Sequence, residues 1–181
     1  MREPENILRI LESSIKCIGE EDTVKLKELS DHTIHSASAE QDPDNVAVAV
    51  IVYSLSKIIE RGAFKDFPEF KKKTISLIKE TISSIKAKDD TLTHKNLSET
   101  RELIEKFSGK LKEYIKDVFR KASINKASKI YEHGISQERT ASLLGITMFE
   151  LASYAGQKDI DGEEKTIDVK KRIKFAEAIF E

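Results

Sequence analysis

Residues 126–157 read KASKIYEHGISQERTASLLGITMFELASYAGQ and indicate three helices separated by two short breaks. The first break is at residues 134–136 (GIS) and the second at residues 145–147 (GIT). Ser136 and Thr147 are good N-cap residues, and a glycine can end a helix by adopting positive φ without steric cost. The stretch therefore predicts helices joined by tight turns, and the rest of the chain can be interpreted outward from it.

Two helices joined by a short turn that contains glycine are typical of the helix-turn-helix motif. The segment resembles prokaryotic members of the helix-turn-helix superfamily, in which a small residue on the first helix is followed by a glycine four positions later. Ala141 and Gly145 match these two positions. Apolar residues that the superfamily places around them are found at Leu144, Ile146, Leu151 and Tyr154. The resemblance implies a transcription regulator or antitoxin-like protein.

Residues 147–157 would form the helix that such proteins insert into the major groove. Lysine and arginine residues around it would bind phosphates, and polar residues at its start would touch bases. The implied DNA-binding residues are Lys126, Lys129, Ser136, Gln137, Arg139, Thr147, Ser153, Gln157 and Lys158. The helix itself has no lysine or arginine, and its only charge is Glu150, which phosphates repel. Met148, Phe149 and Tyr154 therefore offer an alternative, a face that docks another protein.

The remainder of the chain predicts an all-α fold, because it has few helix breakers and its apolar residues recur at helical spacing. The run VAVAVIVY, which begins at Val46, is rich in β-branched residues, and these favour a strand. A helix start signal at Pro43 and the lack of a partner strand favour a buried helix instead. We expect an up-and-down helical bundle over residues 1–120 and a helix-turn-helix module with a terminal helix over residues 121–181. Helices are expected at about 4–18, 22–39, 43–61, 68–87, 92–122 and 169–180, with a loop over 62–68 and a break at Gly109.

The composition of the chain limits the partners and ligands that it is expected to bind. The chain has 181 residues, 35% of them charged, and a net charge of -1, so no global field attracts nucleic acid or an anionic membrane. A single cysteine, Cys17, excludes an intrachain disulfide and a cysteine-based zinc site. The chain has no signal peptide of the usual kind and no apolar run long enough to span a bilayer. We expect a cytoplasmic protein that requires no cofactor.

A second cluster of polar residues lies in the segment 31–35, which reads DHTIH. Asp31 and His35 are four residues apart, and His32 and His35 are three apart, so these side chains share a helix face. Two imidazoles and a carboxylate can bind zinc. The favoured alternative is a hydrogen-bonded structural cluster, because metal sites in helical bundles draw ligands from several helices. His94 is expected to be isolated and exposed.

Three functions remain open at this stage. The first is a non-enzymatic regulatory or adaptor protein that binds duplex DNA through residues 126–157, as a dimer because one reading helix rarely gives enough affinity. The second is a protein-protein scaffold that uses the same segment as a docking face, with a protein partner or a second copy of the chain. The third is a metal-dependent hydrolase or nuclease at Asp31, His32 and His35. The chain has no phosphate loop, no metalloprotease or lipase motif, and no Arg–His pair at the spacing of HEPN ribonucleases.

Overall fold

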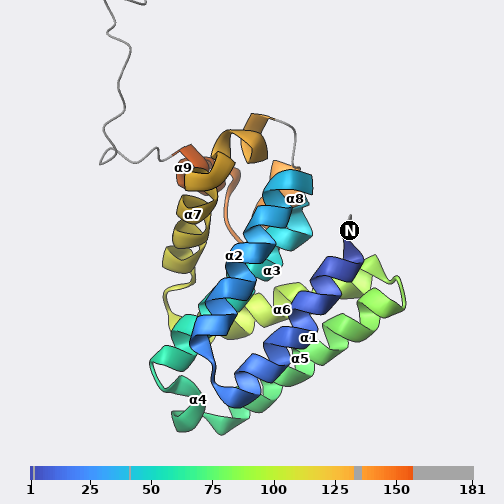
Figure 1. Ribbon diagram of the computed structural model, residues 1–181, viewed down its shortest axis with the longest axis vertical. Helices are drawn as coiled ribbons and strands as arrows, with labels where there is room; N and C mark the ends of the chain where they lie inside the picture. The colour runs from blue at the N-terminus through green and yellow to red at the C-terminus, as the bar shows by residue number, and fades with distance from the viewer. Residues whose placement is uncertain (2, 41, 133–135, 157–181) are drawn as a thin grey trace, which may run out of the picture.

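The computed structural model describes the backbone of residues 1, 3–40, 42–132 and 136–156, and the side chains of 1, 3–34, 42–121 and 136–154 (Figure 1). Within these ranges the chain forms nine helices and no strand, which confirms the all-α class. The helices are α1 (Pro4–Glu20), α2 (Thr23–Glu40), α3 (Pro43–Glu60), α4 (Ala63–Asp66), α5 (Pro68–Lys86), α6 (Asp90–Ser108), α7 (Leu111–Glu132), α8 (Gln137–Leu144) and α9 (Met148–Gly156). The expected terminal helix at 169–180 lies outside the described residues.

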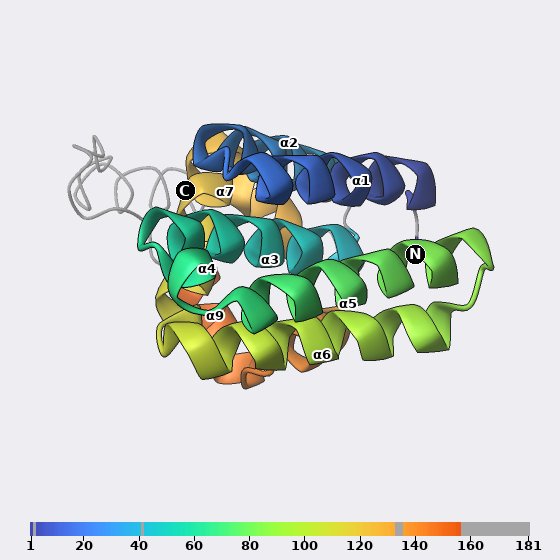
Figure 2. The ribbon, with the colours of Figure 1, turned by 90° about the horizontal axis from the view of Figure 1, so that it is seen from below.

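Helix α3 forms the centre of the molecule. Figure 2 shows it between a layer that contains α1 and α2 and a layer that contains α5 and α6. Sixteen of its 18 residues are buried, which agrees with the prediction of a helix that is apolar on all sides. Its β-branched residues favour a strand in isolation, but tertiary burial outweighs this local preference. Asp42 caps the helix by accepting a hydrogen bond from the Asp44 N–H (3.1 Å), and Pro43 fits the first turn.

Close packing of α2 on α3 depends on small residues. The Ser30 hydroxyl, which is buried on α2, donates a hydrogen bond to the Ala49 carbonyl on α3 (2.9 Å). Other buried hydroxyls, such as those of Ser14 and Ser54, donate to carbonyls four residues earlier in their own helices. The hydroxyl groups of Ser14, Ser30 and Ser54 are thereby satisfied and do not oppose burial.

Most helix boundaries lie within a few residues of those predicted, and the differences have local causes. Asp89 accepts a hydrogen bond from the Leu92 N–H (2.9 Å), so α6 begins at Asp90 rather than further along. Gly109 ends α6 in the left-handed region, with φ 57°, as the predicted break requires. The segment expected to be a loop after α3 contains the short helix α4.

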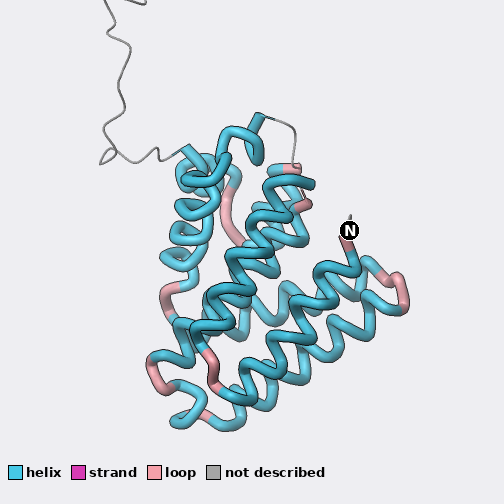
Figure 3. The backbone as a smooth tube through the Cα atoms, in the orientation of Figure 1, coloured by secondary structure: helices cyan, strands magenta, loops and turns pink. Residues whose placement is uncertain are grey.

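The C-terminal helices share the hydrophobic core with the N-terminal ones. Helix α7 packs against α2 and α3, α8 against α3 and α6, and α9 against α7 and α8. Ala141, Leu144 and Leu151 belong to the same cluster of buried side chains as residues of α1 to α6. Figure 3 shows α8 and α9 connected by a short loop. Within the described part of the chain, no helix is long and apolar enough to cross a membrane.

Candidate functional site

Helix α8 has a capped start and a glycine end. The Ser136 side chain accepts a hydrogen bond from the Arg139 N–H (3.3 Å), as an N-cap residue does. At the other end Gly145 adopts φ 63° and ψ 35°, and the Ile146 N–H donates to the Ala141 carbonyl (3.0 Å). This pattern is a Schellman motif, which satisfies carbonyls that the end of the helix leaves unpaired. The turn that the sequence predicts at residues 145–147 is therefore present.

Gly145 is also a point of close approach between α8 and α6. A methyl group added at its Cα would lie 3.0 Å from Arg101 Nε and would overlap the rest of the guanidinium. Arg101 is held there by Glu102 and Glu105, at 3.3 Å from each carboxylate. Glycine is thus favoured at this position by the backbone conformation, and a larger residue would displace the end of the Arg101 side chain.

Helix α9 starts with a reciprocal capping arrangement. The Glu150 N–H donates to Thr147 Oγ1 (3.1 Å), and Glu150 Oε2 accepts hydrogen bonds from the Thr147 N–H (2.9 Å) and the Thr147 hydroxyl (3.0 Å). Lys112 on α7 binds the other carboxylate oxygen at 2.6 Å. The hydrogen bond from Lys112, followed by those from Thr147, lowers the pKa of Glu150 to about 2. The one charge of α9 is therefore neutralised within the protein.

Among the described side chains of α9, Met148, Phe149 and Ser153 are exposed and Ala152 is half-buried, and we call these four residues the α9 face. Phe149 is 82% exposed and Met148 is 43% exposed. Ser153 donates its hydroxyl hydrogen to the Glu150 carbonyl of its own helix (2.8 Å). Tyr154, which the sequence also suggested for docking, is half-buried against the core. The α9 face therefore offers apolar side chains to the outside, with its hydroxyl already hydrogen-bonded.

Two of the described basic residues of α7 and α8 are engaged by carboxylates. Arg139 points inward and binds Asp44, and Lys121 on α7 binds Asp31 (3.0 Å). Ser136 serves as a helix cap, and Gln137 is half-buried. The side chains of the remaining expected DNA-binding residues, Lys126, Lys129, Gln157 and Lys158, lie outside the described residues.

A buried carboxylate joins the start of α3 to α6 and α8. Asp44 is fully buried, and Arg139 Nη2 lies 2.9 and 3.1 Å from its two oxygens. His94 Nε2 lies 3.1 Å from Asp44 Oδ1 and also contacts Arg139. Burial, followed by the nearby Asp42 carboxylate, raises the pKa of Asp44, although Arg139 and His94 oppose the rise. Because Nε2 donates to Asp44 in one tautomer and accepts from Arg139 in the other, His94 is hydrogen-bonded in both.

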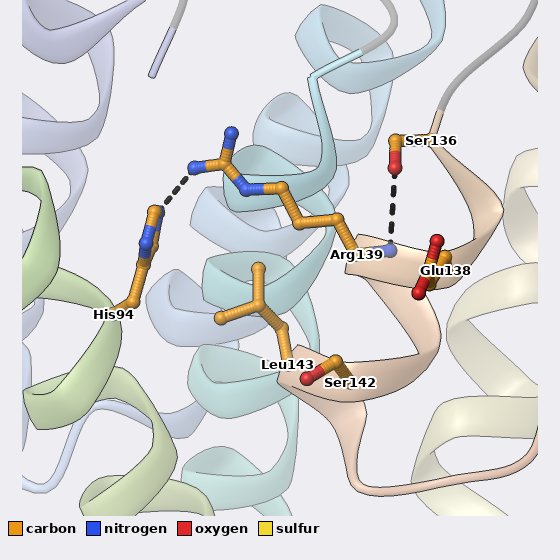
Figure 4. A pocket seen from close by; sticks show the side chains of 6 residues that line it. All are labelled: His94, Ser136, Glu138, Arg139, Ser142 and Leu143. Atoms are coloured by element: carbon orange, nitrogen blue, oxygen red, sulfur yellow. Dashed lines mark hydrogen bonds between the residues drawn. The ribbon is translucent and has the colours of Figure 1, made fainter.

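A cavity of about 350 Å³ opens beside this network (Figure 4). It is lined by His94, Ser136, Glu138, Arg139, Ser142 and Leu143. Arg139 is already paired, and the exposed Glu138 adds a carboxylate, so the cavity has no excess positive charge that would select a phosphate. No hydrogen bond among the described residues joins His94 to Ser136 or Ser142, and the Ser136 side chain caps α8. The contacts of Arg139 with Asp44 tie α8 to α3 beside this cavity.

The second polar cluster does not assemble a metal site among the described residues. Asp31 is bound by Lys121, whose ammonium also lies 4.6 Å from the centroid of the Tyr53 ring. His32 is exposed, and the His35 side chain lies outside the described residues. Throughout the described side chains, no three His, Cys, Asp or Glu residues are grouped so that they could hold a metal ion. What the described contacts show at Asp31 is an ion pair that joins α2 to α7.

The expectation that His94 is isolated is wrong, since His94 contacts both Asp44 and Arg139. These three residues come from three helices and are separated by 45 or more positions, so no local spacing could reveal them. The sequence held one indirect sign of this network. Asp44 is the second residue of an apolar helix, and a carboxylate that is buried there needs a partner.

Comparison with known proteins gives no match: no family model, no curated protein and no solved structure is significantly similar to this chain.

Proposed function

We propose that the protein is a non-enzymatic regulatory or adaptor protein that docks another protein through the α9 face of a helix-turn-helix unit. The observation that carries the proposal is the exposure of Phe149, 82%, on the helix that a DNA reader would insert into the major groove. A phenylalanine that projects from the surface loses unfavourable contact with water when a partner covers it. Such a side chain is typical of the anchors of protein interfaces.

The polar groups of α9 support docking of a protein over base readout. The hydroxyls of Thr147 and Ser153, which the sequence suggested for base contacts, are bonded to Glu150. Reading a base would break these bonds, whereas an apolar partner can cover them without leaving an unsatisfied group. Arg139, the expected phosphate contact, would have to abandon a fully buried carboxylate. Withdrawing the guanidinium from this buried carboxylate is costly, and His94 and the N-terminal ammonium would be its remaining cationic or hydrogen-bonding neighbours.

Site-specific photo-crosslinking tests the proposal. A photoreactive phenylalanine analogue at position 149 is expected to form a covalent adduct with a protein in the source cells. The matched control carries the analogue at Val24 on α2, which is 65% exposed and distant in sequence. A protein adduct specific to position 149 is the expected result. Adducts with nucleic acid, or equal labelling at both positions, would refute the docking function.

A further inference from the structure

His94 on α6 contacts both members of the ion pair that ties α8 to α3. Its Nε2 atom lies 3.1 Å from Asp44 Oδ1. The same atom lies closer still to Arg139 Nη2, and Figure 4 shows this contact as a dashed line. Arg139 Nη2 in turn lies 2.9 and 3.1 Å from the two oxygens of Asp44. One imidazole nitrogen therefore stands between a carboxylate, which accepts hydrogen bonds, and a guanidinium, which donates them.

The contact with Arg139 identifies the protonation state of His94. A guanidinium can donate to Nε2 only when that nitrogen carries no proton. An imidazolium carries a proton on both ring nitrogens, so its Nε2–H would point at the hydrogens of Arg139 and two positive charges would meet. The contact between His94 and Arg139 thus belongs to a neutral imidazole that carries its proton on Nδ1.

We propose that His94 is a proton-operated latch: the neutral imidazole holds Arg139, and with it α8, against α3, and a proton on Nε2 makes His94 displace Arg139 from Asp44. The buried carboxylate keeps a partner in both states, because Nε2 is already within hydrogen-bond distance of Oδ1. A buried charge that exchanges one partner for another avoids the large cost of being left unpaired. The exchange can therefore loosen α8 without unfolding the protein. This inference goes beyond the docking function and does not rest on it.

The charges around the latch make Arg139 the group that a proton on His94 would repel. Within the described part of the chain, the cation that His94 contacts is Arg139. The N-terminal ammonium is shared by two carboxylates, at 3.5 Å from Asp44 and 3.4 Å from Asp90. The other described carboxylates near this point are those of Asp42, which caps α3, and Glu138, which is exposed and lines the cavity.

The cavity beside the latch gives both side chains access to water. His94 is 30% exposed and Arg139 is 37% exposed, and both line the space of about 350 Å³. A displaced guanidinium can therefore be hydrated there. Its departure leaves α8 with the packing of apolar residues such as Ala141 and Leu144 in the core. Because an unperturbed imidazole gains its proton near about pH 6.5, α8 is expected to loosen in mildly acidic solution.

Hydrogen exchange followed by mass spectrometry tests the latch at about pH 8 and about pH 6. The measured quantity is the protection factor, which corrects for the pH dependence of intrinsic exchange. In the wild-type protein, protection of the α8 amides relative to those of α5 is expected to fall about threefold or more at the lower pH. A hydrogen bond to a charged group shifts an equilibrium about tenfold or more, and an imidazole is only partly protonated at about pH 6.

Two variants separate His94 from other titrating groups. His94→Gln cannot take up the proton, but its amide oxygen can still accept from Arg139, so α8 should keep its protection at both pH values. His32→Gln, which replaces an exposed histidine of α2, should behave as the wild-type protein does. Asp44 is present in all three proteins, so protonation of its carboxylate affects them alike.

Nitrogen NMR of the His94 ring gives an independent measurement on the unmodified chain. At about pH 8 the signal of Nε2 is expected to be that of a bare nitrogen, and the signal of Nδ1 that of a protonated one. A protonated Nε2 at that pH would overturn the latch, even if His94→Gln failed to fold. An equal fall of α8 protection in wild type and His94→Gln, or no fall in wild type, would overturn it as well.

Discussion

Replacing Gly145 by alanine probes the turn that positions α9. The residue has φ 63°, a conformation that costs an L-residue about 1–2 kcal/mol. The new Cβ would also lie 3.0 Å from Arg101 Nε and would overlap the guanidinium, so Arg101 must move away from Glu102 and Glu105. These partly exposed ion pairs contribute at most about 1 kcal/mol each. The sum predicts a loss of about 2–3 kcal/mol in the free energy of unfolding.

Gly109 provides the matched control. It has φ 57°, and a Cβ added there meets nothing within 4 Å, so Gly109→Ala carries the backbone cost alone. Urea denaturation followed by circular dichroism should show Gly145→Ala to be less stable than Gly109→Ala by about 1 kcal/mol. In an Arg101→Ala background this difference should disappear. Equal destabilisation of the two single variants would refute the contact between Arg101 and the turn.

Further predictions concern the charged groups and the α9 face. Arg139→Met removes the guanidinium from Asp44, which keeps His94 and the N-terminal ammonium as neighbours, and should cost about 1–3 kcal/mol at about pH 7, a buried-pair cost reduced because Arg139 is 37% exposed. Since burial raises the pKa of Asp44, the native state takes up a proton before the unfolded state does as pH falls, so this penalty should shrink as the pH of the urea titrations is lowered. The pKa of Glu150 is lowered to about 2, so its ionised carboxylate stabilises the native state at pH values above the ordinary pKa of glutamate, and this stabilisation is lost as pH falls through about 2. Glu150→Gln should therefore show a smaller loss of thermal stability than the wild-type protein in that acidic range. Phe149→Ser should reduce binding of a hydrophobic dye without changing the melting temperature, and a lowered melting temperature would mean that Phe149 packs in the core.

Much of the fold follows from local signals in the sequence. Signals that start or end a helix stand at Pro43, at Ser136 and at Gly145. Their effect depends on backbone chemistry within a few residues. The spacing of apolar residues also identified the buried face of each helix, because helical geometry fixes which residues share a side. Helix α4 was missed because a four-residue helix has no periodic pattern of its own.

The contacts between helices could not be predicted in the same way. Arg139 was expected to contact a phosphate, and it instead binds Asp44, a residue 95 positions earlier. Nothing in the local sequence distinguishes an arginine that faces solvent from one that satisfies a buried carboxylate. The absence of basic residues from α9 was visible in the sequence, but the use of Thr147 and Ser153 as internal hydrogen-bond donors required the structure.

We propose that α8 and α9 present an apolar docking face and do not read DNA. The most direct test is fluorescence anisotropy of a labelled pool of random duplexes at low ionic strength, where phosphate contacts are strongest. The protein is predicted to show no saturable binding. Saturable binding that weakens with salt, is lost in Lys126→Ala/Lys129→Ala and is unaffected by Phe149→Ser would contradict the claim.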